Sequence, residues 1–180
     1  MIRLIVTGLM AFLLCSQPSV AQSVGNSVLV QTTAGNFSIE LSQNSAPENI
    51  GRFKMLVQSR FYNGTPFHRV VGGFVAQTGD PSQNGRGGSD LPNVRAENPS
   101  SPFQRGTVAM TRRLDLPGSA NSQFFIMLKD APHLNGKFTI IGRVSGADMS
   151  VLDSLQQGVR ESNYIVNAPD RIVEMSIRSR

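Results

Sequence analysis

The chain has 180 residues, of which 17 are Lys or Arg, 12 are Asp or Glu and one is cysteine. The basic residues are dispersed, with Arg112-Arg113 as the sole adjacent pair. This argues against a nucleic-acid-binding protein, because such proteins gather positive charge on one face. The length suits one hydrophobic core, and no repeat or linker divides the chain.

The first 21 residues have the features of a secretory signal peptide. Arg3 supplies a small positive region, Leu4 to Cys15 form an apolar stretch, and Ser19-Val20-Ala21 is a small-x-small cleavage site. The apolar stretch is shorter than an ordinary membrane span. We therefore predict a cleaved signal peptide over residues 1–21, and one exported domain over residues 22–180 without membrane attachment.

Two other interpretations of this segment stay open, an uncleaved anchor and lipid attachment at Cys15. Leu14 disfavours lipid attachment, because a small residue is expected directly before a lipidated cysteine. After cleavage the chain keeps 180 minus 21, or 159, residues and, without Arg3, a net charge of 16 minus 12, or +4. It then has no cysteine, so its stability must come from packing rather than disulfides.

The rest of the chain predicts many short strands and two helices. Pro47 and Glu48 suit the first turn of a helix that ends near Arg60, and Gly158 is the expected stop of a second helix over Ala147–Gln157. Strands are expected at Val28–Thr32, Phe37–Leu41, Phe67–Val71, Phe74–Gln77, Thr107–Met110, Phe124–Met127, Phe138–Val144 and Arg171–Arg178. This order favours a closed antiparallel barrel capped by helices, with a long loop over Gly79–Ser101.

Common hydrolytic and metal chemistries lack their residues here. There is no G-x-S-x-G motif, and only His68 and His133 could act as a base. Two isolated histidines without a further cysteine make no metal site. The Gly85-x-Gly87-Gly88 segment lacks the Lys-Ser/Thr of a phosphate-binding loop. We therefore expect chemistry without a nucleophile, a metal or a proton carrier, with a hydrolase as a distant alternative.

An arginine and a glutamine eight residues later are the most informative polar pair. Positions two apart in a strand share a face. If the chain is extended around a turn or bulge at Gly72-Gly73, Arg69 and Gln77 point the same way beside Phe74. That arrangement would place hydrogen-bond donors on the rim of an aromatic pocket.

Three segments then resemble cyclophilin-type peptidyl-prolyl isomerases. They are Phe67-His68-Arg69-Val70-Val71-x-Gly73-Phe74-Val75-x-Gln77-x-Gly79-Asp80-Pro81, Gly106-Thr107-Val108-Ala109-Met110 and Ser119-Ala120-Asn121-Ser122-Gln123-Phe124-Phe125-Ile126. Two features resemble the bacterial periplasmic members of this family. They are the export signal and the short segment that links the later motifs. The resemblance implies a mainly β fold, a closed eight-stranded antiparallel barrel capped by two α-helices. It also implies a periplasmic monomer that needs no cofactor and acts on proline-containing polypeptides.

The resemblance also implies roles for individual residues. Arg69 and Gln77 would be catalytic, with Gln77 donating to a substrate carbonyl and helping to hold Arg69. The substrate-binding residues would be Phe74, Val75, Thr111, Arg112, Gln123, Phe125, His133, Leu134 and Phe138. Strand alternation places Phe125 on the face of Gln123 and sends Phe124 to the other side. The competing function is a non-catalytic chaperone module that holds proline-containing chains in the same groove.

Several of these positions depart from common family members. His133 replaces a tryptophan that contacts cyclosporin in many eukaryotic members, so weak cyclosporin binding is expected. Phe138 replaces a histidine, as in bacterial relatives, and keeps the pocket apolar. Thr111 and Arg112 replace a frequent alanine and asparagine, and the Arg112 side chain is expected to bias substrate choice. None of these changes removes the arginine.

Overall fold

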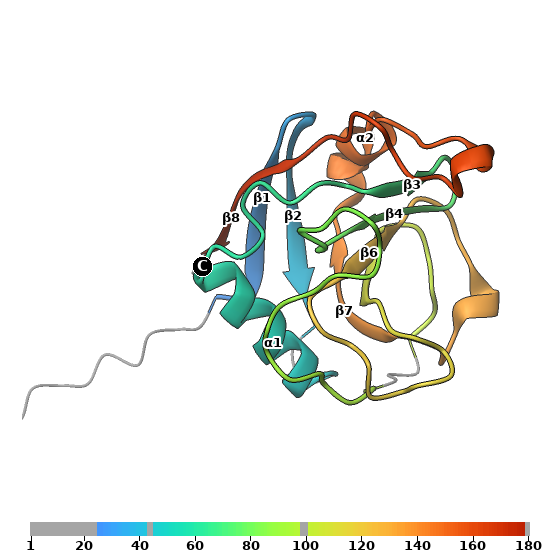
Figure 1. The fold of residues 1–180 in the computed structure, drawn as a ribbon. Coiled ribbons are helices and arrows are strands. Elements are labelled where there is room, and N and C mark those ends of the chain that lie inside the picture. The colour runs from blue at the N-terminus through green and yellow to red at the C-terminus, as the bar shows by residue number, and fades with distance from the viewer. Residues whose placement is uncertain (1–24, 43–44, 98–100, 179–180) are drawn as a thin grey trace, which may run out of the picture.

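The computed structural model describes residues 25–42, 45–97 and 101–178, so the predicted signal peptide lies outside the described residues. Eight strands are present: β1 (Ser27–Thr32), β2 (Gly35–Leu41), β3 (Arg69–Val71), β4 (Val75–Thr78), β5 (Thr107–Met110), β6 (Phe124–Met127), β7 (Thr139–Val144) and β8 (Ile172–Arg178). All neighbouring strands pair antiparallel, in the order β3-β4-β6-β5-β7-β2-β1-β8. The sheet curls into a half-barrel (Figure 1).

The sheet does not close, so the predicted closed barrel is wrong. Among the described residues, β3 and β8 share no ladder, and the isolated bridge between Pro66 and Arg171 lies at their seam. Proline has no N–H to donate to a ladder. The exposed edge of β3 is occupied instead by the segment before β8: Val70 donates to the Tyr164 carbonyl (3.2 Å) and accepts from the Gly158 N–H (3.0 Å).

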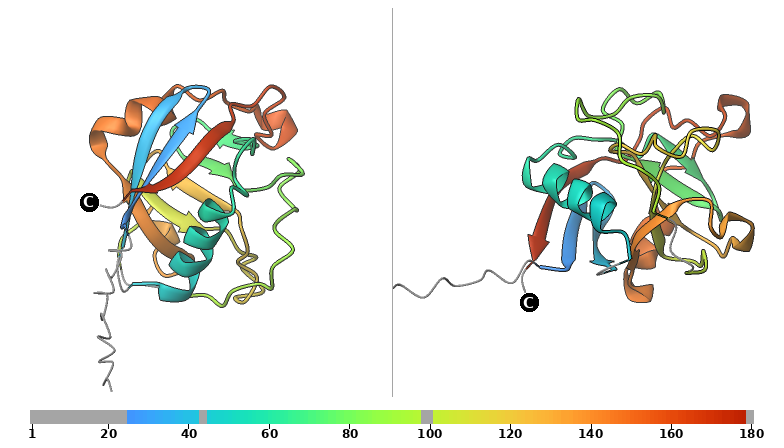
Figure 2. Two further views of the ribbon diagram at one scale, coloured as in Figure 1. Left: turned by 90° about the vertical axis from the view of Figure 1, so that its left-hand side faces the viewer. Right: turned by 90° about the horizontal axis from the view of Figure 1, so that it is seen from below.

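Helix α1 (Pro47–Gln58) begins where the sequence predicts and ends two residues before Arg60. Proline at the first helical position and an acid in the first turn both favour this start. Its apolar stripe is buried against the sheet and consists of Ile50, Phe53, Leu56 and Val57. The helix covers one end of the half-barrel (Figure 2). In the described part of the chain, no helix is long and apolar enough to span a membrane.

The second helix is shorter than the predicted Ala147–Gln157. A 3-10 turn over Gly146–Asp148 leads into α2 (Met149–Asp153), which lies at the other end of the half-barrel from α1 (Figure 1). The helix ends early because the Gln156 N–H donates to the Asp170 carboxylate (2.8 Å) rather than back along the helix. Three apolar residues of the predicted range are nonetheless buried: Met149, Leu152 and Leu155. Two further 3-10 turns span Pro132–Leu134 and Arg160–Ser162.

The sheet separates two apolar clusters, and strand alternation assigns residues to each. The larger cluster fills the concave side, where Phe124 meets the rings of Phe53 and Tyr62 edge-on. The smaller cluster lies on the outer face and includes Phe125 and Phe103. Phe124 and Phe125 therefore face opposite sides of β6, as predicted. The outer cluster is the base on which the candidate site is built.

Candidate active site

One row of residues crosses the outer face of three neighbouring strands. Arg69 of β3 pairs directly with Gln77 of β4, which pairs with Phe125 of β6. Directly paired residues in an antiparallel sheet project from the same face. The turn that permits this register contains Gly73 at φ +65°, a conformation that suits glycine. The predicted turn and the shared face of Arg69 and Gln77 are thus confirmed.

A cavity of about 340 Å³ lies beside this row. Its size and mainly apolar walls are typical of small-ligand sites. All but two of the predicted site residues line it, together with Leu114: Arg69, Phe74, Val75, Gln77, Thr111, Arg112, Phe125, Leu134 and Phe138. The two others are Gln123, which lines a neighbouring cavity, and His133, whose ring stacks on Phe74 at 6.1 Å. The structure brings the predicted residues together; their roles stay predictions.

An aromatic stack forms the base of this cavity. The Phe125 ring meets Phe138 edge-on at 5.1 Å and stacks parallel to Phe103 at 6.1 Å. Sequence reasoning missed Phe103, because it follows a long irregular loop without periodicity and only its buried position reveals it. Leu114 was also missed, and it stands exposed on the cavity rim.

Arg112 lies at the mouth of the cavity. Its guanidinium carbon is 5.8 Å from the centroid of the Phe138 ring, within cation–π range. One Nη atom also donates to the Arg113 carbonyl (3.2 Å). Among the described residues, the Arg112 N–H and C=O have no hydrogen-bond partner. The backbone of Arg112 can therefore pair with an extended peptide.

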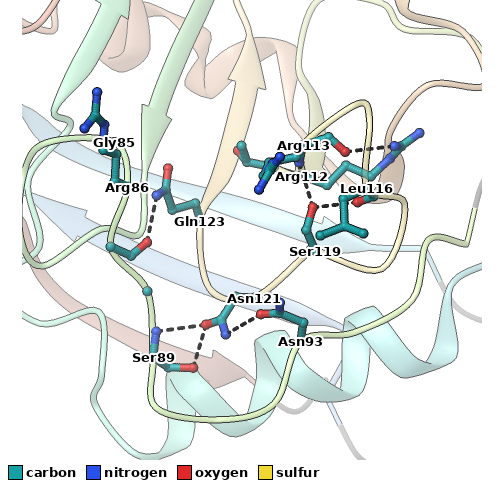
Figure 3. A pocket seen from close by; sticks show the side chains of 13 residues that line it. Gly85, Arg86, Ser89, Asn93, Arg112, Arg113, Leu116, Ser119, Asn121 and Gln123 are labelled. Atoms are coloured by element: carbon teal, nitrogen blue, oxygen red, sulfur yellow. Dashed lines mark hydrogen bonds between the residues drawn. The ribbon is translucent and has the colours of Figure 1, made fainter.

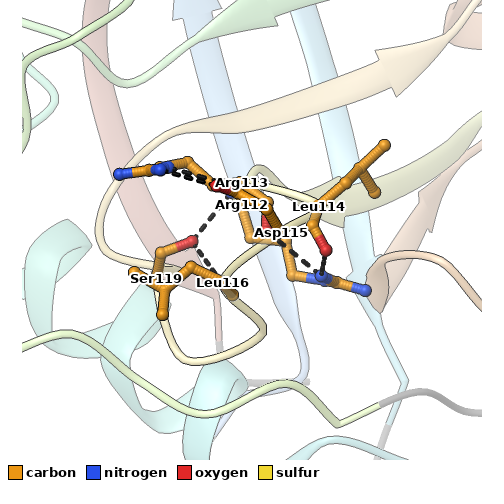
Figure 4. Close-up of polar contacts among 6 residues, drawn as sticks. All are labelled: Arg112, Arg113, Leu114, Asp115, Leu116 and Ser119. Carbon is orange, nitrogen blue, oxygen red and sulfur yellow. Dashed lines mark hydrogen bonds and ion pairs between the residues drawn. The ribbon is translucent and has the colours of Figure 1, made fainter.

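The loop after Arg112 is held by its own polar contacts (Figure 4). Arg113 forms an ion pair with Asp115 at 2.7 Å. The Ser119 hydroxyl accepts from the Arg113 N–H (2.8 Å) and donates to the Leu116 carbonyl (2.7 Å). These bonds give the loop a defined shape beside the cavity.

A second cavity of about 570 Å³ adjoins the first and shares Thr111 and Arg112 with it. Figure 3 shows its lining, which includes Arg86, Arg112 and Arg113 and, within the described part of the chain, no carboxylate. Gln123 and Asn121 point into it from the segment around the start of β6. An extended chain that enters the first cavity can reach this basic cavity.

A hydrogen-bond relay joins the two cavities to a buried carboxylate. Gln77 Nε2 donates to Gln123 Oε1 (2.9 Å), and Gln123 Nε2 donates to the Gly87 carbonyl (2.8 Å). The Gly87 N–H in turn donates to Asp80 (3.2 Å). The described residues show no hydrogen bond between Gln77 and Arg69, so Gln123, and not Arg69, is the partner that orients the Gln77 amide.

Asp80 anchors the loop that follows β4. Its carboxylate accepts hydrogen bonds from Ser82, Gly85 and Gly87. Burial alone would raise the pKa of Asp80, but the hydrogen bonds from these three residues outweigh it and hold the pKa below the ordinary 3.8. The anchor is therefore an anion at neutral pH.

The Arg69 guanidinium is half-buried and lies over the Tyr164 ring, with 5.9 Å between its carbon and the ring centroid. Burial lowers the pKa of Arg69 from its ordinary value, and Tyr164 opposes the shift. Arginine nevertheless stays a cation in proteins. His68 is buried beside Asp80, and burial, with a smaller contribution from the charge of Arg69, lowers the pKa of His68. The site thus presents a permanent cation beside an apolar cavity.

Comparison with known proteins places this geometry in a family. A family model described as cyclophilin type peptidyl-prolyl cis-trans isomerase/CLD matches residues 27–177. The chain belongs to the cyclophilin family. A probable peptidyl-prolyl cis-trans isomerase of Brucella suis is 39% identical to this cyclophilin over 174 residues, which cover 91% of this chain and 88% of that protein. The peptidyl-prolyl cis-trans isomerase of Helicobacter pylori strain J99 is 40% identical over 132 residues, or 72% and 80% of the two chains.

Solved cyclophilin structures have the same fold. A Cryptosporidium parvum cyclophilin, crystallised in the presence of the dipeptide Ala-Pro, matches with a TM-score of 0.77 and 27% identity, over 86% of this chain and 99% of that one. The cyclophilin AquaCyp293 from Hirschia baltica matches with a TM-score of 0.74 and 26% identity, over 85% and 74%. This cyclophilin is accordingly a peptidyl-prolyl cis-trans isomerase.

Proposed function

We propose that this cyclophilin is exported and, as a monomer without a cofactor, isomerises X–Pro bonds in extended segments of other exported proteins. Arg69 and Gln77 are its catalytic residues. The observation that carries this proposal is the strand register that aligns Arg69, Gln77 and Phe125 beside one apolar cavity. An arginine, an amide and an aromatic base together suit a reaction that needs hydrogen bonds rather than proton transfer.

The barrier to X–Pro rotation explains the need for a cation. An amide resists rotation because its C–N bond has partial double-bond character, with a barrier of about 18–20 kcal/mol. In the twisted state the prolyl nitrogen becomes pyramidal and regains its lone pair. Arg69 donates to this nitrogen or to the proline carbonyl, which stabilises the twisted state more than either planar isomer. Only such differential binding accelerates the reaction.

The surrounding residues hold the substrate. The proline ring enters the cavity against Phe125, with Phe74, Leu134 and Phe138 around it. Gln77 donates to a substrate carbonyl, and the free backbone groups of Arg112 pair with the residue before the proline. The Cryptosporidium parvum cyclophilin was crystallised in the presence of Ala-Pro, which supports a proline-containing substrate for this chain as well.

Catalysis by Arg69 is tested with two substitutions. Arg69→Ala removes the donor, and we expect kcat/KM to fall about 100-fold or more, the usual loss for a donor that acts in the transition state. Arg69→Lys keeps the charge but not the planar pair of donors, and we expect a smaller loss. Near wild-type rates in Arg69→Ala would refute the mechanism.

Export is tested by expressing the full chain in a Gram-negative host. The signal segment predicts a periplasmic product that starts at Gln22, which intact-mass measurement identifies. The control is Ala21→Leu, which puts a bulky residue at the cleavage site and should leave the segment attached. A wild-type product that stays in the cytoplasm with residues 1–21, or that has the added mass of a lipid, would contradict the proposal.

A further inference from the structure

The side chain of Arg69 is held by an aromatic ring and not by an acid. Among the described residues Arg69 has no salt bridge, and its side chain makes no hydrogen bond. Its guanidinium carbon lies 5.9 Å from the centroid of the Tyr164 ring. That distance is within the range of a cation–π interaction.

The loop that carries Tyr164 has an uncommon backbone. Asn163 and Tyr164 are consecutive non-glycine residues with φ of +53° and +61°. L-residues rarely adopt this left-handed region, and a bulky tyrosine less often than an asparagine. Such a conformation persists only where the surrounding structure imposes it, and it is concentrated at functional sites.

The surrounding structure fixes this loop to the strand residue next to Arg69. The Tyr164 carbonyl accepts from the Val70 N–H (3.2 Å), and the Gly158 N–H donates to the Val70 carbonyl (3.0 Å). A Cβ at Gly158 would lie 2.1 Å from the Tyr164 carbonyl oxygen, so glycine is required for this approach. The position of residue 164 is therefore set by its backbone contacts, and its side chain is left to contact the Arg69 guanidinium.

An aromatic face suits a cation that must keep its donors. A carboxylate partner would engage the N–H groups of Arg69 and cancel its charge. The face of a ring attracts the cation through the π-system and leaves in-plane N–H groups available. The contact therefore orients Arg69 without occupying the groups that a substrate needs.

We propose that Tyr164 is a positioning residue for prolyl isomerisation, with its ring holding the Arg69 guanidinium in the orientation that meets the twisted amide. This inference rests on the proposed catalytic role of Arg69. The ring face acts, and the hydroxyl does not, so phenylalanine can replace tyrosine but a non-aromatic residue cannot.

Two substitutions separate this role from a structural one. Tyr164→Phe keeps the ring, and we expect kcat/KM within about twofold of wild type. Tyr164→Asn removes the ring but suits the left-handed backbone, so it should fold at least as stably as wild type. We expect its kcat to fall about tenfold with KM nearly unchanged, because the contact acts on the transition state.

A spectroscopic measurement follows Arg69 itself. The NMR signal of its Nε–H group in the protein should be displaced by the ring current of residue 164. We expect the signal to keep its position in Tyr164→Phe and to move toward that of a free arginine in Tyr164→Asn. A signal that is the same in both variants would overturn the inference.

A double-mutant cycle distinguishes the failure of this inference from that of the proposed function. Adding Tyr164→Asn to Arg69→Ala should lower the residual kcat/KM by clearly less than the tenfold expected in the wild-type background, because Arg69→Ala has already removed the cation that the ring holds. An equal loss in both backgrounds, or a fully active Tyr164→Asn beside an impaired Arg69→Ala, would overturn only the role of Tyr164. A fully active Arg69→Ala would overturn the proposed function itself.

Discussion

His68 and Arg69 are neighbours in the chain, but their surroundings differ. Arg69 faces the cavity and keeps its charge, whereas His68 is buried beside Asp80 and its two ring nitrogens have no hydrogen-bond partner among the described residues. Burial disfavours the charged imidazole and lowers the pKa of His68 below 6.5, which outweighs the opposite effect of Asp80. Neutral His68 is thus part of the packing and stands away from the chemistry.

A pH dependence of stability follows from this burial. As pH falls below 6.5, the unfolded chain takes up a proton on His68 before the folded chain does, so the free energy of unfolding must decrease. The slope is at most about 1.4 kcal/mol per pH unit for one proton. Urea unfolding at pH 7.5 and 5.5 measures it, and His68→Gln should show a smaller decrease. An unchanged decrease in that variant would show that His68 is not responsible.

Asp80 is the residue on which the relay to Gln77 ends. Asp80→Asn would place an amide N–H₂ against backbone donors of the loop, so we expect a loss of about 1–3 kcal/mol in the free energy of unfolding. The Gly87 carbonyl should shift as well, and the amide signals of Gln123 and Gln77 should then move in NMR spectra. A variant with unchanged stability and unchanged amide signals would contradict the anchoring role of Asp80.

At the level of elements, two adjacent phenylalanines of β6 have different roles. Phe124 packs in the core, and Phe125 lines the cavity. Phe124→Ala should empty a closed part of the core beside Phe53 and Tyr62 and lower the free energy of unfolding by about 3–5 kcal/mol. Phe125→Ala should destabilise less, because Phe125 borders an open cavity, and should lower kcat/KM far more. Urea unfolding and rate measurements on both variants check this. Equal effects on both quantities would contradict the register of β6.

Local sequence patterns predicted the elements and much of the site. Period-two alternation identified the faces of Phe124 and Phe125, and the glycine pair located the turn between Arg69 and Gln77. The predicted length of the second helix was wrong because Asp170, which is distant in sequence, accepts a hydrogen bond from the Gln156 N–H and so ends the helix early. Tyr164 and Phe103 were missed for the same reason: each reaches the site through tertiary packing that no local pattern records.

For the whole molecule, the open seam and the two adjoining cavities decide what the fold can bind. The closed barrel was predicted both from the order of the elements and by resemblance, but the segment over residues 158–170 lies along β3 and satisfies the edge that would otherwise meet β8. This same segment carries Tyr164. The segment that takes the place of β8 beside β3 therefore also brings the Tyr164 ring against the Arg69 guanidinium.

The basic second cavity predicts a charge preference in substrates. Three arginines and no carboxylate line it among the described residues, and the cavity stays net positive although Asp115 pairs with Arg113, so a glutamate shortly before the proline should give a higher kcat/KM than a lysine there, by about fivefold, or ~1 kcal/mol. Added salt should weaken the preference. Arg112→Ser and Arg113→Ser should reduce it, whereas Arg178→Ser on β8 should not. Equal kcat/KM values for the glutamate and lysine peptides would show that the cavity does not discriminate between substrates by charge.

The most direct test of the account separates binding from catalysis at Arg69. NMR on an Ala-Pro-Phe peptide gives both the cis–trans exchange rate and the dissociation constant, without a coupling protease, for wild type and Arg69→Ala. We predict fast exchange in wild type, and in Arg69→Ala an exchange rate near that of the free peptide with affinity changed only a few-fold. Exchange that survives in the variant, or that is lost only in proportion to affinity, would contradict the claim that Arg69 stabilises the twisted amide.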